Sequence, residues 1–307
     1  MGDRFEVKRM RQWITHWRLA LGLGLMLVLS SACSLESLSA GQEMGESLPD
    51  AIASIPDTEN TSILWEGHWN APDWQEHWQV RSEGAWGLDN LEVIAEPESS
   101  TPFLRVHYPA GSASPSVSRR NNVALGGMQY YADLNLPSSN HLRLRYRVRF
   151  SDNFDFVKGG KLPGLFGGNG ASGGTIPNGT DGFSTRLMWR QDGDGEVYAY
   201  LPTSENFGTS IGRGNWQFRP GEWVTIEQEV ILNQPGEADG RIRLWVDEQL
   251  VVDESELLFR TVDTLQIDGI FFSTFFGGGD PSWATPHDVY ADFADFQVYA
   301  SEALLNR

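Results

Sequence analysis

The sequence predicts an all-β protein, an antiparallel β-sandwich of jelly-roll type. Two observations predict this class. Apolar and polar residues alternate with a period of two in many segments, whereas helical periodicity is scarce. The segments between the alternating runs are rich in Gly, Pro, Asn and Asp, as in proteins that join many strands by long turns.

The first 33 residues have the features of an export signal rather than of a folded domain. Five basic residues precede the apolar run "LALGLGLMLVL" at 19–29, which is too short to span a bilayer comfortably. The run ends in "SSAC", and Cys33 is the only cysteine of the chain. This pattern resembles a bacterial lipoprotein signal, in which the cysteine is lipidated and becomes the first residue. The alternatives are an uncleaved membrane anchor and an ordinary signal peptide with an incidental cysteine.

Residues 34–60 are small, polar and acidic, which predicts a flexible acidic tether. Residues 61–300 contain most of the aromatic side chains and are expected to form one sandwich domain. A lipid on Cys33 would place this domain at the cell envelope, on the periplasmic or the outer surface, with the lipid as its only contact with the membrane. Without the lipid the protein would be secreted. A monomer is expected.

The charge of the chain is strongly negative, and its cations are few. The formal net charge is −18, and removal of residues 1–32 takes away five basic and two acidic residues, which brings it to −21. Such a protein should not bind nucleic acid or anionic lipid non-specifically. Only three lysines are present, at positions 8, 158 and 161. Two of them flank paired glycines in "FVKGGKLPGLFGG" (156–168). This segment is therefore unusual in a chain that otherwise avoids lysine.

Several strands follow from alternation alone. The segment "LRLRYRVRF" (142–150) places five apolar residues on one face and four arginines on the other, which form either a basic track for a polyanion or a solvated strand face. Further strands are predicted at 223–232, at 241–253 as two short strands around Asp247 and Glu248, and at 288–300. A slip in the alternation of 288–300 predicts a β-bulge.

The segment "FSTRLMWRQDGDGEVYAYL" (183–201) predicts a hairpin, because "QDGDG" is a turn signal between two alternating runs. If paired residue numbers sum to 386, Arg186 faces Tyr200. A solvated polar face is the alternative to a site. The predicted polar face comprises Ser184, Arg186, Met188, Arg190, Glu196, Tyr198 and Tyr200, and the predicted core face Leu187, Trp189, Val197, Ala199 and Leu201.

The neighbouring segments narrow the kind of site. Residues 159–182 contain ten glycines and are expected to form a loop that lets backbone approach a ligand closely. A phosphate-binding loop is disfavoured, because no Walker pattern is present and no helix follows. The "DGDG" stretch lacks the later acidic residue of a calcium loop, and no cluster of His and Cys exists, so neither a metal nor a cofactor is expected.

Four motifs in order resemble polysaccharide lyase family 14, which includes alginate and glucuronan lyases with a β-jelly-roll fold. They are "FVKGGKLPGLFGG", "FSTRLMWR", "EVYAYLP" and "FSTFFGGGDPSWA" (272–284), and the resemblance covers roughly 140–300. It implies that Lys161 is catalytic and that Ser184, Arg186, Tyr198 and Tyr200 line the same site, with Ser184 orienting the substrate. Arg190, on the same predicted face, is also expected to bind substrate. Lys158 is not expected to belong to the active site.

The implied reaction is β-elimination in a 1,4-linked polyuronate, an acidic polysaccharide, to give unsaturated uronate ends. A cation must neutralise the carboxylate beside the proton that leaves, and Arg186 fits this role. Lys161 is the expected base and Tyr198 or Tyr200 the acid, while the exchange of these roles stays open.

The alternative function is a non-catalytic carbohydrate-binding sandwich. A hydrolase would need two carboxylates, and this face offers only Glu196. The loop "GGGDPSW" either covers the groove or is a plain turn.

Overall fold

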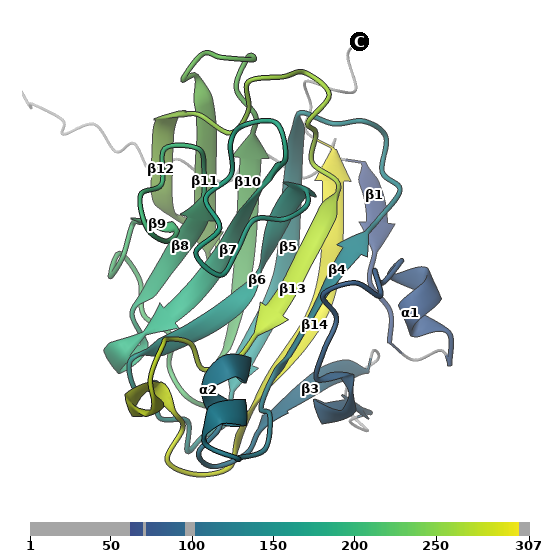
Figure 1. The fold of residues 1–307 in the computed structure, drawn as a ribbon. Helices are drawn as coiled ribbons and strands as arrows, with labels where there is room; N and C mark the ends of the chain where they lie inside the picture. Colours follow the sequence, from purple (N-terminus) through teal and green to yellow (C-terminus); the bar gives the residue numbers. More distant parts are fainter. Residues whose placement is uncertain (1–61, 70–71, 96–101, 301–307) are drawn as a thin grey trace, which may run out of the picture. The chain divides into compact units, whose positions relative to one another are not determined.

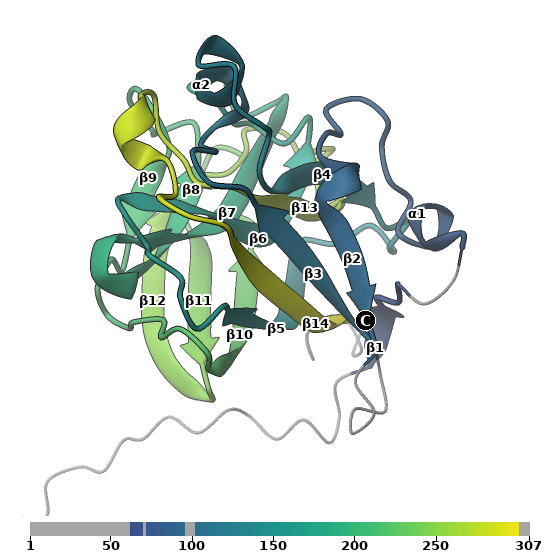
Figure 2. The ribbon, with the colours of Figure 1, turned by 90° about the horizontal axis from the view of Figure 1, so that it is seen from below.

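Two antiparallel β-sheets face each other and enclose the hydrophobic core, as expected for a sandwich of jelly-roll type (Figures 1 and 2). The computed structural model describes residues 62–69, 72–95 and 102–300. The expected signal at 1–33, with Cys33, and the expected tether at 34–60 lie outside these residues. None of the helices in the described ranges is long and apolar enough to cross a membrane.

The larger sheet has eight strands. β1 pairs with the C-terminal part of β14, beside the path formed by the other seven strands. In spatial order that path is β12 (Gln249–Leu257), β11 (Gly240–Val246), β10 (Trp223–Ile231), β5 (His141–Phe150), β14 (Val289–Ala300), β3 (Phe103–Tyr108) and β2 (Leu91–Ile94), and β1 is Ile63–Glu66.

The smaller sheet has six strands, and the short helical segments lie outside the two sheets. The strands are, in spatial order, β4 (Met128–Asp133), β13 (Gly269–Thr274), β6 (Gly159–Gly168), β7 (Gly182–Arg190), β8 (Gly195–Tyr200) and β9 (Thr209–Ile211). The helices are α1 (Trp74–His77) and α2 (Pro115–Arg120), with 3₁₀ turns at Leu88–Asn90, Gln191–Gly193 and Pro281–Trp283.

Strand β5 confirms the prediction from alternation. Its five apolar side chains are at most 1% exposed and face the core, because alternate residues of a strand point to opposite sides. Burying each of them stabilises the fold by about 1.5–3 kcal/mol relative to exposure. The four arginines point outward from the larger sheet, away from the core.

The outward arginines are mostly neutralised, so the expected basic track does not form on β5. Arg143 pairs with Glu227 at 2.7 Å, Arg147 with Asp295 at 2.6 Å, and Arg149 with Asp292 at 2.7 Å. The guanidinium groups of Arg143 and Arg149 also lie 4.7 Å from the ring centres of Trp245 and Trp223. The row is therefore an ion-paired face, and neither of the two expected forms describes it fully.

Two turn and bulge predictions are confirmed. Asp247 and Glu248, both at positive φ, join β11 to β12 as predicted for 241–253. In β14 the register against β5 shifts between Ala294 and Gln297, so the slip in the alternation corresponds to a bulge. Asp295, within this bulge, has a φ of 53°.

The expected glycine-rich loop at 159–182 is wrong in its first half, because residues 159–168 form β6 in the middle of the smaller sheet. Small residues are needed there. A side chain on Gly160 would come within 2.0 Å of the Trp189 ring, and one on Gly164 within 2.2 Å of the Thr185 carbonyl. Only the residues between β6 and β7 form a loop, so glycine serves close packing between strands as well as flexibility.

A bulge in β6 accommodates a proline within a central strand. The register against β7 shifts between Leu162 and Leu165, which places Pro163 and Gly164 in the bulge. Two side chains of the larger sheet bind backbone atoms of this bulge and of the residue that follows it. The Tyr146 hydroxyl donates to the Pro163 carbonyl at 3.1 Å, and the Gln228 side-chain oxygen accepts from the Leu165 amide at 3.0 Å.

Gln228 is fully buried, and its amide nitrogen also donates to the Thr185 carbonyl at 2.5 Å. Gln228→Leu should lower the free energy of unfolding by about 2–4 kcal/mol, because it leaves buried backbone groups without partners. Chemical denaturation would measure this. Gln217→Leu, at an exposed position, is the control and should change the free energy by at most about 0.5 kcal/mol. Equal values for the two variants would contradict the role assigned to Gln228.

Candidate active site

A pocket of about 540 Å³ opens on the outer face of the smaller sheet, on the side away from the core. Strands β6, β7 and β8 form its floor. The loops before α2, after β6, after β8 and after β13 form its walls. The residues of its floor are Lys161, Arg186, Met188, Arg190, Tyr198 and Tyr200.

Lys161 lies on β6 opposite Met188 of β7, so it shares the outward face of Arg186. Its ammonium nitrogen contacts the Met188 sulfur and lies 4.1 Å from the centre of the Tyr198 ring. Desolvation in the pocket lowers the pKa of Lys161 well below its usual value, and the positive charges of Arg186 and Arg190 lower it further. The carboxylate of Glu196 acts in the opposite direction. The neutral amine is therefore accessible at this position.

Arg186 is a buried cation without a carboxylate partner among the described residues. It is 2% exposed, and one terminal nitrogen donates to the Ser273 hydroxyl at 3.2 Å. Its Nε has no hydrogen-bond partner, and its guanidinium lies 4.4 Å from the centre of the Phe271 ring. Desolvation lowers the pKa of Arg186. A buried guanidinium in this state costs free energy unless an anion enters the pocket and pairs with it.

The two tyrosines lie on β8 next to the cations, with their ring centres 5.6 Å apart. Tyr198 pairs with Arg186 across the sheet and is half-buried. Desolvation and the neighbouring Tyr200 raise the pKa of Tyr198 to about 12, so its hydroxyl stays protonated near neutral pH. Tyr200 is 2% exposed, and its hydroxyl accepts a hydrogen bond from the Gly174 amide at 3.0 Å, which fixes the loop after β6.

The predicted faces of the hairpin are confirmed, but the predicted register is wrong by one pair. Arg186 pairs with Tyr198 and Ser184 with Tyr200, so paired numbers sum to 384. The turn is tighter than expected, because Asp192 and Gly193 adopt positive φ and only four residues, 191–194, join β7 to β8. A shift of two residues keeps every side chain on its face, so the polar side chains stay together.

Two of the predicted residues have structural partners. The Ser184 hydroxyl is fully buried and donates to the Ala171 carbonyl at 2.7 Å, so it supports the loop after β6 and does not line the pocket, contrary to expectation. Arg190 does line the pocket, but it binds the buried Glu196 at 2.5 Å. Ser210 donates to the other oxygen of Glu196 at 2.6 Å.

The loop containing Gly278, Gly279 and Trp283 forms one wall of the pocket, as expected if "GGGDPSW" borders a groove. Lys158 contacts this loop from outside, since its ammonium donates to the Ser282 hydroxyl at 2.5 Å. The segment around α2 lies beside the loop (Figures 1 and 2), and Ser114 donates to the Gly278 carbonyl at 2.8 Å. The two lysines therefore occupy different places, one in the pocket and one behind its wall.

Sequence reasoning missed Gln129 and Phe207, which also line the pocket. Gln129 of β4 pairs with Ser273 of β13 and accepts a hydrogen bond from the Ser273 hydroxyl at 3.2 Å. Because Arg186 donates to the same hydroxyl, Ser273 links Gln129 to Arg186. Gln129 and Ser273 are 144 positions apart in the sequence, so no local pattern indicates that they meet. Phe207 is 62% exposed, and the signal in the sequence that could have identified it was an aromatic residue within the polar stretch "TSENFGTS" (203–210) after the hairpin.

No group of three or more His, Cys, Asp or Glu side chains that could hold a metal ion occurs in the part of the chain that the structure describes. The floor of the pocket presents an amine, two guanidinium groups, two phenols and a thioether. Such a set can bind a carboxylate and move protons next to it.

Comparison with known proteins matches residues 96–296 to the family described as Polysaccharide lyase 14. The chain is similar in structure to the marine PL-14 alginate lyase from Aplysia kurodai, with 34% identity, a TM-score of 0.68, and coverage of 77% of this chain and 98% of that one. Among curated proteins no match was found.

Two further solved structures have the same fold. The alginate lyase vAL-1 from Chlorella virus is 22% identical with a TM-score of 0.57, and covers 69% of this chain and 89% of its own. The endo-β-1,4-glucuronan lyase from the fungus Trichoderma reesei is 13% identical with a TM-score of 0.51, and the match covers 78% of this chain and 96% of that one. These two comparisons confirm the sandwich.

The electrostatic coupling in the pocket can be tested without a substrate. Glu196→Gln removes the negative charge that raises the pKa of Lys161, so the pH at which half of Lys161 is deprotonated should fall. Competitive labelling of lysines with acetic anhydride, followed by peptide mass spectrometry, would measure that pH. Asp194→Asn removes the same charge in the same hairpin but outside the pocket, and should leave the pH of half-deprotonation of Lys161 nearly unchanged. A rise in Glu196→Gln would contradict the coupling.

Proposed function

The chain belongs to polysaccharide lyase family 14, and on that premise we propose that Lys161, Arg186 and Tyr198 carry out the β-elimination by which this lyase cleaves a polyuronate. The observation that carries the assignment is the buried guanidinium of Arg186, which lacks a carboxylate partner in the described residues and faces a pocket containing an amine and two phenols. Alginate is the proposed substrate, because the PL-14 relative at 34% identity is named an alginate lyase. Glucuronan is the second candidate.

Arg186 would bind the carboxylate of the uronate at the cleavage point. Removal of the proton on carbon 5 places further negative charge on that carboxylate, and a preformed cation in a desolvated pocket stabilises it by several kcal/mol. Because the guanidinium is already buried and held by Ser273, little reorganisation accompanies the reaction. This arrangement supports a role in the transition state as well as in binding.

Lys161 would act as the base and Tyr198 as the acid. The neutral amine takes the proton from carbon 5, the electron pair forms the double bond between carbons 4 and 5, and the bond from carbon 4 to the glycosidic oxygen breaks. The Tyr198 hydroxyl gives its proton to that oxygen. The lowered pKa of Lys161 and the raised pKa of Tyr198 favour this order over the reverse. The rate should rise with pH through the Lys161 pKa, because only the neutral amine accepts a proton.

Phe207 and Trp283 would bind the sugar rings on opposite sides of these groups. Both line the pocket from loops, and Phe207 is largely exposed. Exposed aromatic rings at the rim of a polar pocket bind the apolar faces of ligands. Tyr200 would hold the loop after β6 through Gly174 rather than transfer a proton.

We also propose that Cys33 is lipidated and that residues 34–60 tether the lyase to the cell envelope. The basic region, the apolar run and the single cysteine support this location. The net charge of −21 that remains after removal of residues 1–32 would keep the protein from adsorbing to anionic lipid, so the lipid would be the only anchor.

The two lysines of the domain are matched controls for catalysis. Lys161→Ala should lower kcat by about two to four orders of magnitude, because the base is lost while the fold remains. Lys161→Arg should recover little, since a guanidinium does not accept a proton near neutral pH. Lys158→Ala removes an exposed contact worth at most about 1 kcal/mol, so its rate should fall by about fivefold at most. Ultraviolet absorbance of the new double bond measures turnover.

Three outcomes would change the assignment. Equal losses at positions 158 and 161 would mean that the segment contributes only positive charge. Full activity of Lys161→Arg would transfer the role of base to a tyrosine. Binding of uronate polymers by the wild type without turnover would favour a carbohydrate-binding module.

The location has its own test. Cys33→Ser should release the protein from membranes or block its processing, because serine cannot form the thioether bond to a lipid. Fractionation of cells followed by immunoblotting measures this. A variant of mature size that stays with the membrane would contradict lipidation.

A further inference from the structure

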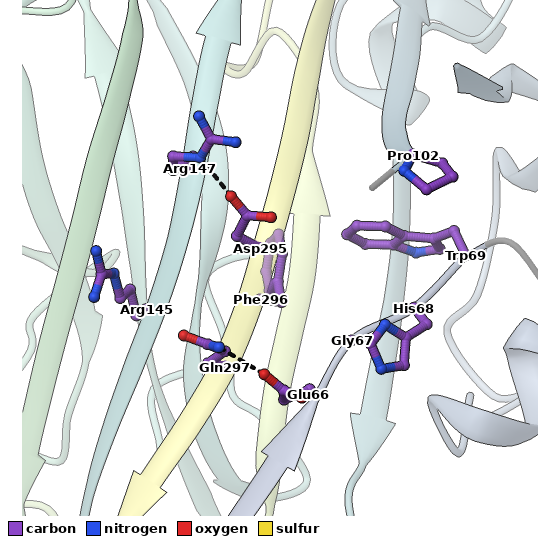
Figure 3. Close-up of a pocket in the computed structure, with 10 residues that line it drawn as sticks. All are labelled: Glu66, Gly67, His68, Trp69, Pro102, Arg145, Arg147, Asp295, Phe296 and Gln297. Atoms are coloured by element: carbon purple, nitrogen blue, oxygen red, sulfur yellow. Dashed lines mark hydrogen bonds and ion pairs between the residues drawn. The ribbon is translucent and has the colours of Figure 1, made fainter. Parts of the chain in front are cut away.

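A second pocket, of about 440 Å³, lies on the outer face of the larger sheet (Figure 3). Its residues come from β1, β5 and β14 and from the loops that flank β1 and β3. The two sheets turn their outer faces in opposite directions, so this pocket is separate from that of Lys161. Its volume is within the range of small-ligand sites, roughly 300–1,000 Å³.

The bulge of β14 shapes this pocket. Ala294 pairs with Arg147 and Gln297 with Arg145, so two residues of β14 face one residue of β5. Asp295 adopts a φ of 53°, which an aspartate adopts only at some cost. Bulges and such backbone strain are concentrated at functional sites, where they redirect side chains. Here the Asp295 carboxylate lies on the outer face beside Arg147, which it binds (Figure 3).

Arg145 differs from the other three arginines of β5, because it forms no ion pair with a carboxylate of the described residues. Its neighbour on β10 is Glu227, which is occupied by Arg143 at 2.7 Å. Its neighbour on β14 is Gln297, which is uncharged. The side chain that it contacts is Tyr299, through the hydroxyl. Glu66 and Asp295 line the same pocket but do not pair with Arg145, so its half-buried guanidinium is available to an anion from outside.

The groups around Arg145 suit a sugar. Asp295 binds the Nε of Arg147 at 2.6 Å, and Gln297 donates its amide to Glu66 at 2.6 Å, so both carboxylates are held in place (Figure 3). Each retains oxygens that accept from sugar hydroxyls. The His68 ring, which is exposed, provides a flat surface at the same opening.

We propose that this pocket is a second, non-catalytic binding site for one acidic sugar residue of the polymer, with its carboxylate on Arg145 and its hydroxyls on Asp295 and Glu66. The choice of a uronate rests on the proposed function. A polymer chain held on this face stays close to the enzyme after each cleavage, which raises its local concentration at the catalytic pocket.

Affinity electrophoresis through gels that contain alginate tests the site on the full chain. All proteins carry Lys161→Ala, so that the polymer stays intact. Addition of Arg145→Met should reduce the retardation and raise the apparent Kd for alginate about tenfold, because a charged hydrogen-bonding partner is lost. Arg145→Lys keeps the charge without the two-pronged geometry and should be intermediate. Arg241→Met is the matched control, with the same change of charge on the same sheet face but an exposed partner, Asp253, and should be retarded like the parent.

Kinetics then separate this proposal from the proposed function. With Lys161 intact, Arg145→Met should raise KM for long polymer several-fold and leave kcat and the rate on trisaccharides unchanged. Melting temperatures confirm that both Arg145 variants fold. Equal retardation of the Arg145 and Arg241 variants, or equal retardation of the parent by a neutral glucan, overturns the second site while leaving the lyase assignment intact. Absence of turnover by the wild type overturns the lyase assignment, and retardation that still depends on Arg145 supports the second site.

Discussion

The bulge of β6 is the constraint on which the pocket of Lys161 and Arg186 depends. Leu162 and Leu165 both face the core, which an unbroken strand would not allow, because residues three apart point to opposite faces. The extra residue at Pro163–Gly164 changes the alternation, so Lys161 faces the pocket while the leucines remain in the core. Tyr146 and Gln228 hold the bulge from the opposite sheet. The position of the lysine is thus set by hydrogen bonds that cross the core.

Charge is distributed differently over the two outer faces of the sandwich. On the larger sheet, cross-strand carboxylates accompany Arg143, Arg147 and Arg149, which keeps an arginine-rich strand stable and soluble. In the pocket of the smaller sheet, Arg186 and Lys161 have no such partners among the described residues. A protein with a net charge of −18 repels polyanions at long range, so attraction must come from these few uncompensated cations. Arg145 of the larger sheet also forms no ion pair among the described residues, although Glu66 and Asp295 line its pocket.

Desolvation is the largest influence on the protonation states in the pocket of Lys161 and Tyr198. Desolvation disfavours the charged form of any group, so it lowers the pKa of Lys161 and raises that of Tyr198. Both groups are driven toward their neutral forms, an amine that accepts a proton and a phenol that donates one. The same desolvation strengthens the attraction between Arg186 and a bound carboxylate. Burial alone therefore favours the proposed assignment of base and acid.

The sequence by itself determined the features that depend on neighbours along the chain. Alternation predicted the two faces of β5 and of the hairpin, the bulge in 288–300 and the sandwich, and the ordered motifs identified the family and led to the proposal of Lys161 as the base. Tertiary structure decided the rest. It set the register that pairs Arg186 with Tyr198, made β6 a strand where a loop was expected, and buried Ser184 against Ala171. It also joined Gln129 to Ser273 and left Arg145 without a carboxylate. The physical reason is that alternation records only which side of a strand a residue occupies, whereas pairing partners, desolvation and pKa depend on strands more than a hundred residues away.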